Sequence, residues 1–211
     1  MTIIYQVVGY TTRALDELNE GDLLCDFCGP LGNPTEIRGI KRAAVVGGGV
    51  GCAIAYPVAK ALKAQGSEVD AIIGFRSGAQ VILQSEFSAV SRVFVATEDA
   101  SVGERGYVTD LLARLLDKGE KYDTVFAIGP LAMMKSVCEL TKIHGIRTVV
   151  SMNPIMIDGT GMCGGCRLTV DGKTKFACVD GPDFDGHKVD FDSAALRAAA
   201  YREHECKLMN R

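Results

Sequence analysis

Three of the eight cysteines, Cys163, Cys166 and Cys178, lie close together in a glycine-rich stretch of the chain. In a chain with no sign of secretion, cysteines at such short spacing are more typical of metal ligands than of disulfide partners. Asp158 precedes Cys163 by the interval that separates the first two ligands of C-x4-C-x2-C loops, which hold [2Fe-2S] clusters. We therefore predict that Asp158, Cys163, Cys166 and Cys178 are metal ligands, with Asp158 in the place of the first cysteine.

A hairpin signal within the same stretch supports this prediction. Asp171-Gly172 follows a short apolar run, and this dipeptide is typical of a two-residue β-turn. Counting outward along both strands from that turn brings Cys178 opposite Gly165, beside Cys166. Alternatives remain open: a structural zinc site with the same ligands, thiols without a metal, or an Asp158 that only forms a turn before the next glycine.

The rest of the chain alternates between short apolar runs and helical segments. Strands are expected at 43–46, 69–75, 93–96, 124–128 and 147–150, and helices at 54–65, 107–116, 131–144 and 193–209. Asp192 or Ser193 is the expected cap of the last helix. This alternation indicates an α/β fold with a parallel sheet and helices on both faces. Further strands are expected at 2–8 and 23–27, with a helix at 14–18 between them, as the last fragment of a separate β structure.

A glycine loop, Gly47–Gly51, follows the first of the sheet strands and opens a helix, which is where a pyrophosphate meets helix N–H groups. The match to G-x-G-x-x-G is incomplete, because position 52 is Cys. The second strand ends in Arg76 and Ser77 rather than in an acidic residue. These side chains suit a ribose 2′-phosphate, although a solvated arginine explains them equally well. Gly129-Pro130 marks another sharp turn from strand to helix at the same edge.

The composition excludes several classes of protein. The 211 residues are 47% hydrophobic and 23% charged, with a net charge of -3, as in ordinary globular proteins. This charge favours neither nucleic acid nor an anionic membrane as a partner. The sequence has neither an apolar run long enough for a membrane helix nor a signal-peptide pattern. We therefore expect a cytoplasmic protein that binds neither nucleic acid nor membranes.

Several of these motifs occur in an order that resembles the ferredoxin–NADP reductase superfamily. They are Gly29-Pro30-Leu31-Gly32, the Gly47–Gly51 loop, the acidic loop 98–106, Gly129-Pro130-x-x-Met133-Met134 and the cluster at 158–178. The chain looks closest to the small (alpha) subunit of NADH-dependent reduced ferredoxin:NADP oxidoreductase, also known as sulfide dehydrogenase. It is also similar to the electron-transfer subunit of dihydroorotate dehydrogenase. That subunit has four cysteines, so Asp158 favours the ferredoxin:NADP group.

The resemblance implies cofactors and roles for further residues. It places Thr12 near the phosphates of FAD, Gly48, Gly49 and Gly51 beside the nucleotide pyrophosphate, and Gly129, Pro130 and Met133 beside the nicotinamide. From the residues alone, Met133 is more simply a core residue of its helix. The implied cofactors are a [2Fe-2S] cluster, NAD(H) or NADP(H), and FAD. No acid or base side chain of this chain is expected to be catalytic.

The resemblance also implies a domain order. Residues 1–38 are expected to be the C-terminal part of an FAD-binding β-barrel with its linker, 39–151 the NAD(P)-binding domain, 152–190 the [2Fe-2S] module and 191–211 a helical tail. By comparison with the family pattern, the front of the barrel with its FAD motif is missing. Either the start is truncated or another chain supplies that half, so FAD binding by this chain alone is left open.

The implied function is that of an oxidoreductase subunit in a heterodimer. Electrons would pass from NAD(P)H and FAD through the cluster to a partner, which is a large flavin and iron–sulfur subunit. Ferredoxin or a similar carrier is the further partner. Rival hypotheses are a dihydroorotate dehydrogenase electron-transfer subunit and a redox or nucleotide-binding module without catalysis. A third is a scaffold held together by zinc.

Overall fold

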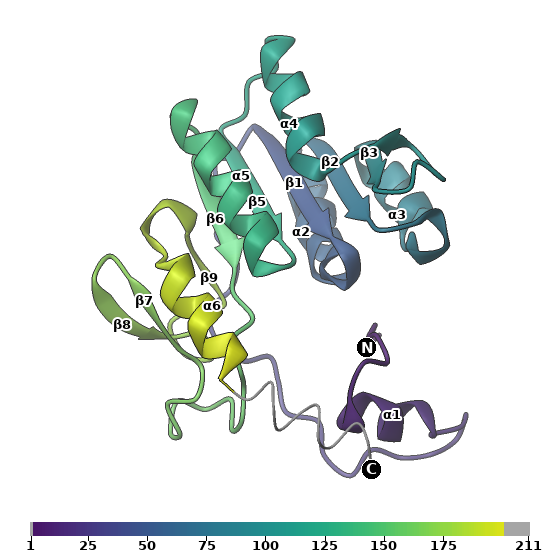
Figure 1. Cartoon of the computed structure of the whole chain (residues 1–211), viewed down its shortest axis with the longest axis vertical. Coiled ribbons are helices and arrows are strands. Elements are labelled where there is room, and N and C mark those ends of the chain that lie inside the picture. The colour runs from purple at the N-terminus through teal and green to yellow at the C-terminus, as the bar shows by residue number, and fades with distance from the viewer. Residues whose placement is uncertain (1, 201–211) are drawn as a thin grey trace.

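The computed structural model describes residues 2–200 and contains one seven-stranded sheet (Figure 1). The strand order is β4-β3-β2-β1-β5-β6-β9, and all neighbouring strands are parallel except β6 and β9. The strands are β1 (Arg42–Gly48), β2 (Glu68–Phe75), β3 (Arg92–Thr97), β4 (Glu104–Arg105), β5 (Thr124–Ile128), β6 (Arg147–Ser151) and β9 (Asp183–Asp185). This order confirms the predicted α/β fold with a mainly parallel sheet.

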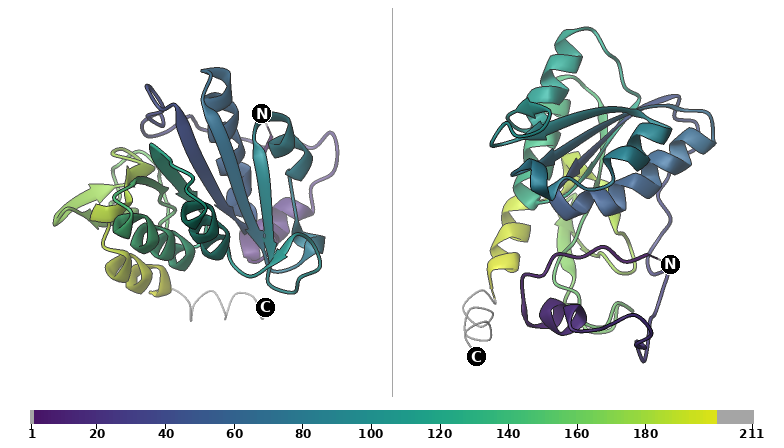
Figure 2. Two further views of the ribbon diagram at one scale, coloured as in Figure 1. Left: turned by 90° about the horizontal axis from the view of Figure 1, so that it is seen from above. Right: turned by 90° about the vertical axis from the view of Figure 1, so that its right-hand side faces the viewer.

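Helices cover both faces of the sheet, because its central strands are apolar on both sides. Along β1, Val45 packs into the core of one face and Val46 into the core of the other. The first face carries α2 (Cys52–Ala64) and α3 (Gln84–Val90), and the second carries α4 (Val108–Asp117) and α5 (Leu131–Ile143) (Figure 2). Within residues 2–200, no helix combines the length and apolar character that crossing a bilayer requires. The short α3, β4 and β9 were not predicted from the sequence.

The predicted hairpin after the sheet is confirmed. β7 (Arg167–Val170) pairs with β8 (Lys173–Phe176), with Val170 opposite Lys173. Asp171 and Gly172 have φ values of 52° and 70°, as a type I′ turn requires. Leu168 joins the same hydrophobic core as residues of α4 and α5. The hairpin and the sheet therefore share one core.

The last described helix, α6 (Phe191–Ala199), contacts both α5 and β7. Its cap is Asp190, whose carboxylate accepts a hydrogen bond from the backbone N–H of Ser193 at 2.9 Å, so the predicted cap at Asp192 or Ser193 is wrong. The helix begins earlier because Phe191 is buried and anchors the first turn. The predicted continuation of this helix beyond residue 200 lies outside the described residues.

The N-terminal segment differs most from the prediction. Residues 2–8 and 23–27 form no strands, and the helix between them is α1 (Tyr10–Asp16), earlier than expected. A strand needs a second strand to satisfy its backbone groups, and none runs beside either segment within residues 2–200. Large apolar side chains here are left exposed to solvent: Ile3, Ile4, Tyr5, Val7, Val8, Tyr10, Leu18, Leu23, Leu24, Phe27 and Leu31.

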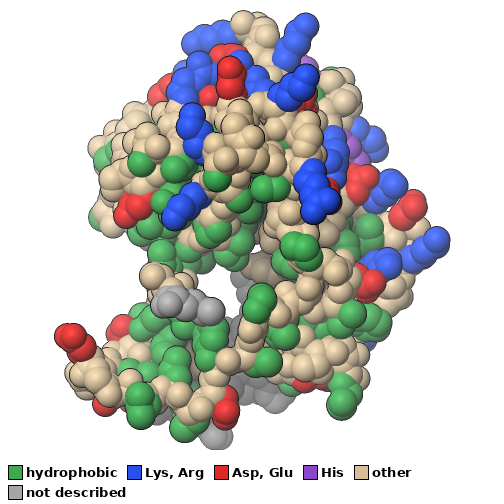
Figure 3. Space-filling model, turned by 180° about the vertical axis from the view of Figure 1, so that it is seen from behind, with side chains coloured by type: hydrophobic (Ala, Val, Ile, Leu, Met, Phe, Trp, Pro, Cys, Tyr) green, Lys and Arg blue, Asp and Glu red, His purple; other side chains and the backbone are tan. Residues whose placement is uncertain are grey.

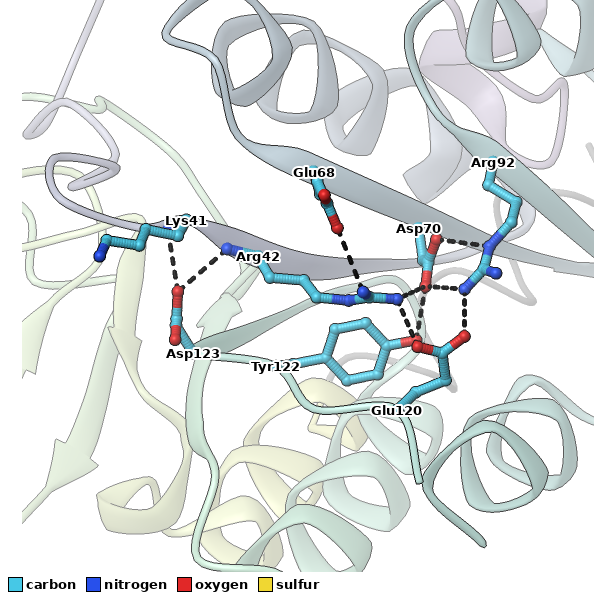
Figure 4. A network of polar contacts seen from close by, with 8 residues as sticks. All are labelled: Lys41, Arg42, Glu68, Asp70, Arg92, Glu120, Tyr122 and Asp123. Atoms are coloured by element: carbon cyan, nitrogen blue, oxygen red, sulfur yellow. Dashed lines mark hydrogen bonds and ion pairs between the residues drawn. The ribbon is translucent and has the colours of Figure 1, made fainter. Parts of the chain in front are cut away.

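A polar network joins the amino ends of β1, β2 and β3 (Figure 4). Asp70 is almost completely buried and accepts two hydrogen bonds from Arg92, at 2.9 and 2.7 Å, and one from the Tyr122 hydroxyl at 2.7 Å. Arg42 lies 3.6 Å from the same carboxylate and also pairs with Glu120. Burial, followed by the Asp70 carboxylate, raises the pKa of Tyr122. The network holds the strands together at their amino ends, on the side of the sheet opposite their carboxyl ends. We therefore assign it a structural role.

Ala100 provides a test of backbone strain in the exposed loop after β3. Its φ is 62°, a left-handed value that suits glycine. Replacing Ala100 with glycine is expected to stabilise the protein by about 0.5–1 kcal/mol, since the relief of strain exceeds the added entropy of the unfolded chain. The same replacement at the exposed helical Ala61 should instead cost about 0.5–1 kcal/mol. Urea unfolding measures both, and equal losses in the two variants would show that Ala100 is unstrained.

Candidate functional site

The carboxyl ends of β1 and β5 lie where the strand order reverses. From β1 the chain proceeds outward through β2 and β3, and it then returns to the other side of β1 at β5. Open α/β sheets bind their ligands at such a point. The predicted glycine loop lies there, because β1 ends at Gly48 and Gly49–Gly51 forms the turn that opens α2. Backbone N–H groups at this helix start are suited to face an anion.

The structure brings the Gly129-Pro130 turn against this loop, although the two motifs are far apart in sequence. A Cβ atom on Gly48 would lie 2.5 Å from the Met133 sulfur and 3.0 Å from Pro130 Cδ. A Cβ atom on Gly51 would lie 2.6 Å from the backbone oxygen of Ile128. Gly51 is therefore required by close packing against backbone atoms, and a side chain on Gly48 would displace Met133 and crowd Pro130. Met133, half-buried at the start of α5, lies against the glycine loop.

Arg76 and Ser77 follow β2, in which Gly74 lies beside Gly48 of β1. Arg76 is exposed, and Ser77 is half-buried. The loop after β3 folds over this edge, because the backbone N–H of Gly78 donates to the Ser101 hydroxyl at 2.6 Å. Sequence reasoning did not single out Ser101 as a site residue. Its position in the polar loop that follows β3 was the available signal.

Thr12 makes its hydrogen bonds within the N-terminal segment. Its hydroxyl oxygen accepts hydrogen bonds from the backbone N–H groups of Val8 and Gly9, both at 3.0 Å, and donates to the carbonyl of Gly9. Figure 1 shows that α1 stands apart from the sheet. The structure therefore gives Thr12 a local role in starting α1, and its predicted contact with FAD stays a prediction.

The cysteine stretch brings its predicted ligands together in two pairs. The Sγ atoms of Cys166 and Cys178 lie 3.2 Å apart and are buried. The hairpin register holds them there, since the N–H of Ala177 donates to the carbonyl of Cys166. Asp158 accepts a hydrogen bond from the backbone N–H of Cys163 at 2.7 Å, and both residues are exposed.

The loop between these pairs has a backbone suited to enclosing an anionic metal centre. Gly159, Gly161 and Gly164 all have positive φ. The N–H of Gly165 points at Cys163 Sγ at 3.3 Å. Hydrogen bonds from backbone N–H groups, first that of Thr160, lower the pKa of Asp158. The residues thus fit a centre with sulfur and carboxylate ligands.

The donors do not surround a single point. Among the described residues, no three His, Cys, Asp or Glu side chains converge closely enough to hold one metal ion. The two pairs differ in burial, since Cys166 and Cys178 are buried whereas Asp158 and Cys163 are exposed. Two such pairs are compatible with a centre that contains two metal ions.

The remaining described cysteines lack these features. Burial raises the pKa of the Cys52 and Cys138 thiols to about 12, so both are inert core residues. Cys25 and Cys28 are exposed in the N-terminal segment. Cys206 lies outside the described residues.

Residues 31–33 also support the stretch that carries the predicted ligands, and the sequence did not predict these contacts. The Asn33 side chain donates to the carbonyl of Val179 at 2.9 Å, and its backbone N–H donates to that of Gly181 at 2.6 Å. A Cβ atom on Gly159 would lie 2.7 Å from Leu31. Residues 31–33 therefore pack against both ends of the predicted ligand stretch.

Comparison with known families supports the assignment of this stretch. The family described as the iron-sulfur cluster binding domain of dihydroorotate dehydrogenase B matches residues 153–190. The match covers the four predicted ligands and the hairpin.

Curated relatives and solved structures extend the similarity to nearly the whole chain. A homologue of the dihydroorotate dehydrogenase B (NAD(+)) electron transfer subunit from Thermotoga maritima is 47% identical over 96% of this chain and 72% of its own length. The corresponding subunit from Caldanaerobacter subterraneus is 36% identical over 90% of this chain and 76% of its own length. A chain in the structure of NADH-dependent reduced ferredoxin-NADP oxidoreductase has a TM-score of 0.92 and 43% identity, covering 98% of this chain and 75% of its own.

Proposed function

Because this chain belongs to the family of dihydroorotate dehydrogenase B electron transfer subunits and their homologues, we propose that it passes electrons between a nicotinamide nucleotide, FAD and a [2Fe-2S] cluster, and on to a partner subunit. It is an oxidoreductase subunit. The observation that carries the proposal is the close approach of the Cys166 and Cys178 sulfurs, beside Asp158 and Cys163, within the stretch that matches an iron–sulfur family.

The four predicted ligands would hold the cluster from two sides. When bound, a [2Fe-2S] cluster would supply a centre that takes up and releases single electrons. Cys166 and Cys178 would hold its inner side from the hairpin, and Asp158 and Cys163 its outer side from the loop. A zinc site with these four ligands needs all donors around one ion. The separation into two pairs favours the two-iron centre.

The rim of the cysteine loop is suited to contact with a partner. Met162, Ile157 and Val179 are exposed large apolar residues, with 90%, 73% and 49% of their surface accessible. Such side chains beside an exposed Cys163 favour a protein surface that covers the loop. We propose a heterodimer with a large flavin and iron–sulfur subunit, which in turn serves ferredoxin or a similar carrier.

The flavin site is proposed to need further β structure. Figure 3 shows hydrophobic side chains gathered on the part of the molecule below the opening that separates it from the sheet domain. Residues 2–31 supply exposed apolar side chains but form no strands. We propose that residues 1–38 are the C-terminal part of an FAD-binding β-barrel with its linker. The divisions 39–151, 152–190 and 191–211 are proposed as the nucleotide domain, the cluster module and the tail.

Two subtypes of this function can be distinguished. The relatives named for dihydroorotate dehydrogenase favour that enzyme as partner, whereas Asp158 in the place of a cysteine favours the ferredoxin:NADP type. We propose the latter. The proposed nucleotide is NAD(H) or NADP(H), with Arg76 and Ser77 at the end of β2 as its proposed contacts. A cytoplasmic location stays a prediction.

The test is anaerobic purification from the source organism, with iron, acid-labile sulfide, zinc and flavin counted together with the partner. The proposal expects iron and sulfide in equal amounts, flavin and a large flavin and iron–sulfur partner. Zinc without sulfide would overturn it in favour of the scaffold. A dihydroorotate-oxidising partner would establish the other subtype. Reduction of the cluster by NAD(P)H without turnover, when FAD and partner are present, would indicate a module without catalysis.

The glycine loop provides a prediction for nucleotide binding. Replacing Gly48 with alanine is expected to weaken NADH or NADPH binding about tenfold, equivalent to about 1.4 kcal/mol, because the new methyl group displaces Met133 and Pro130 from the loop. Fluorescence titration of the reduced nucleotide measures the affinity.

The matched control for this prediction is Gly9, which lies in the N-terminal segment before α1. No atom lies within 4 Å of a Cβ added to Gly9, and its backbone is extended, with φ of -152°, so alanine fits there without strain. Gly9→Ala should leave the nucleotide affinity unchanged. Unchanged affinity in the Gly48 variant would remove the glycine loop from the nucleotide site.

A further inference from the structure

Two arginines hold the cysteine loop from outside its ligand set. The guanidinium of Arg197, on α6, donates to the carbonyl of Gly165 at 3.2 Å. The guanidinium of Arg167, at the start of β7, donates to the carbonyl of Gly164 at 3.1 Å. These two glycines lie between Cys163 and Cys166. Both arginines therefore bind the short link that joins the outer and inner ligand pairs.

The same link carries an N–H group that points at sulfur. The N–H of Gly165 points at Cys163 Sγ, while the carbonyls of Gly164 and Gly165 are turned toward the arginines. The Gly164–Gly165 peptide unit thus has its carbonyl on a guanidinium and its N–H on a ligand sulfur. Fixing the carbonyl fixes the direction of that N–H, because the peptide unit is planar.

The position of Arg197 depends on a well-anchored helix. Asp190 caps α6, Phe191 and Ala194 are buried, and Lys135 of α5 pairs with Asp192 at 2.7 Å. Arg197 itself is half-buried and lines a small cavity between α6 and the cysteine loop. It reaches the loop from a packed helix.

Among the described residues, no carboxylate neutralises the charges of these arginines. Within residues 2–200, neither Arg167 nor Arg197 lies within ion-pair distance of a carboxylate, whereas Arg42, Arg92 and Arg114 all do. A centre held by three thiolates and a carboxylate is anionic, and reduction adds one more negative charge. Nearby positive charge stabilises the reduced form more than the oxidised form.

We infer that Arg197 and Arg167 are positioning residues that orient the cysteine loop and raise the reduction potential of the cluster. The inference rests on the proposed function, because it requires the cluster to bind. It concerns the potential and not the identity of the ligands.

The test uses the anaerobically purified complex, with the midpoint potential measured by a redox titration followed by electron paramagnetic resonance. Arg197→Gln is expected to keep iron and sulfide but to shift the potential to more negative values, and Arg197→Lys to shift it less. Arg167→Gln should shift it in the same direction. Lys118→Gln, which removes an equal charge just after α4, should leave it unchanged. Higher salt should narrow the difference between Arg197→Gln and the unmodified protein, because salt screens charge.

An unchanged potential in both glutamine variants, with full iron and sulfide, would overturn the inference. If Arg197→Gln loses the cluster, the midpoint potential of Arg167→Gln becomes the test, and an unchanged potential in that variant would overturn the inference. Absence of iron and sulfide from the unmodified complex would instead overturn the proposed function.

Discussion

Replacing Asp158 with alanine is expected to remove most of the iron and sulfide from the protein. The Asp158 carboxylate is exposed, ionised at neutral pH and directed at the start of the ligand loop, where it accepts from the backbone N–H of Cys163. Mutation of a residue that only hydrogen-bonds to a metal ligand typically lowers metal affinity by roughly 10–100-fold. Loss of a ligand itself should lower it further. Iron and sulfide analysis, with the visible spectrum, measures the loss.

Two further variants separate ligation from a turn-forming role. Asp158→Cys should keep the cluster and change its potential, because a thiolate occupies the same place in four-cysteine loops. Asp158→Asn keeps an oxygen that can accept from the N–H groups of Thr160 and Cys163, but it is a poorer ligand without the charge. If Asp158 only forms the turn, asparagine should retain the cluster fully, with an unchanged spectrum and potential. That result would remove Asp158 from the ligand set.

The cysteine site was largely predictable because its geometry is local. Asp171-Gly172 fixes a two-residue turn, and the register of that turn alone brings Cys178 back beside Cys166. The contacts from Asn33 and Arg197 were not predictable, since each joins segments that only the tertiary fold brings together. The sequence thus indicates the ligands but not what supports their loop.

The same distinction explains the rest of the fold. β5 matches its predicted ends, because a short apolar strand between turn signals is a local pattern. The contact between Gly48 and Met133 depends on the order of strands in the sheet, which residue spacing does not reveal. At residues 2–8 the β-branched composition favours a strand, but strand formation needs a partner that the described residues do not provide. The lack of a pairing strand therefore outweighed the strand propensity of these residues.

The network at the amino ends of the strands gives the largest expected effect on stability. Replacing Asp70 with asparagine should lower the free energy of unfolding by about 2–3 kcal/mol, less than the roughly 3–5 kcal/mol that breaking a buried ion pair typically costs. The half-exposed side chain of Arg92 reduces the loss, since water partly solvates the charge left behind. The amide also places an N–H group against the donors of Arg92 and Tyr122. Urea unfolding measures the difference.

A matched control lies in the same network. Glu68 pairs with Arg42 at 3.1 Å, but its side chain is 76% exposed, so Glu68→Gln should cost less than about 1 kcal/mol. Because the network lies at the sheet edge opposite the glycine loop, Asp70→Asn should leave nucleotide affinity unchanged at temperatures where the protein stays folded. Equal and small losses in both variants would show that the buried carboxylate is solvated by water rather than held by its partners. A loss of nucleotide affinity in folded Asp70→Asn protein would instead mean that the two edges of the sheet are coupled through β1 and β2.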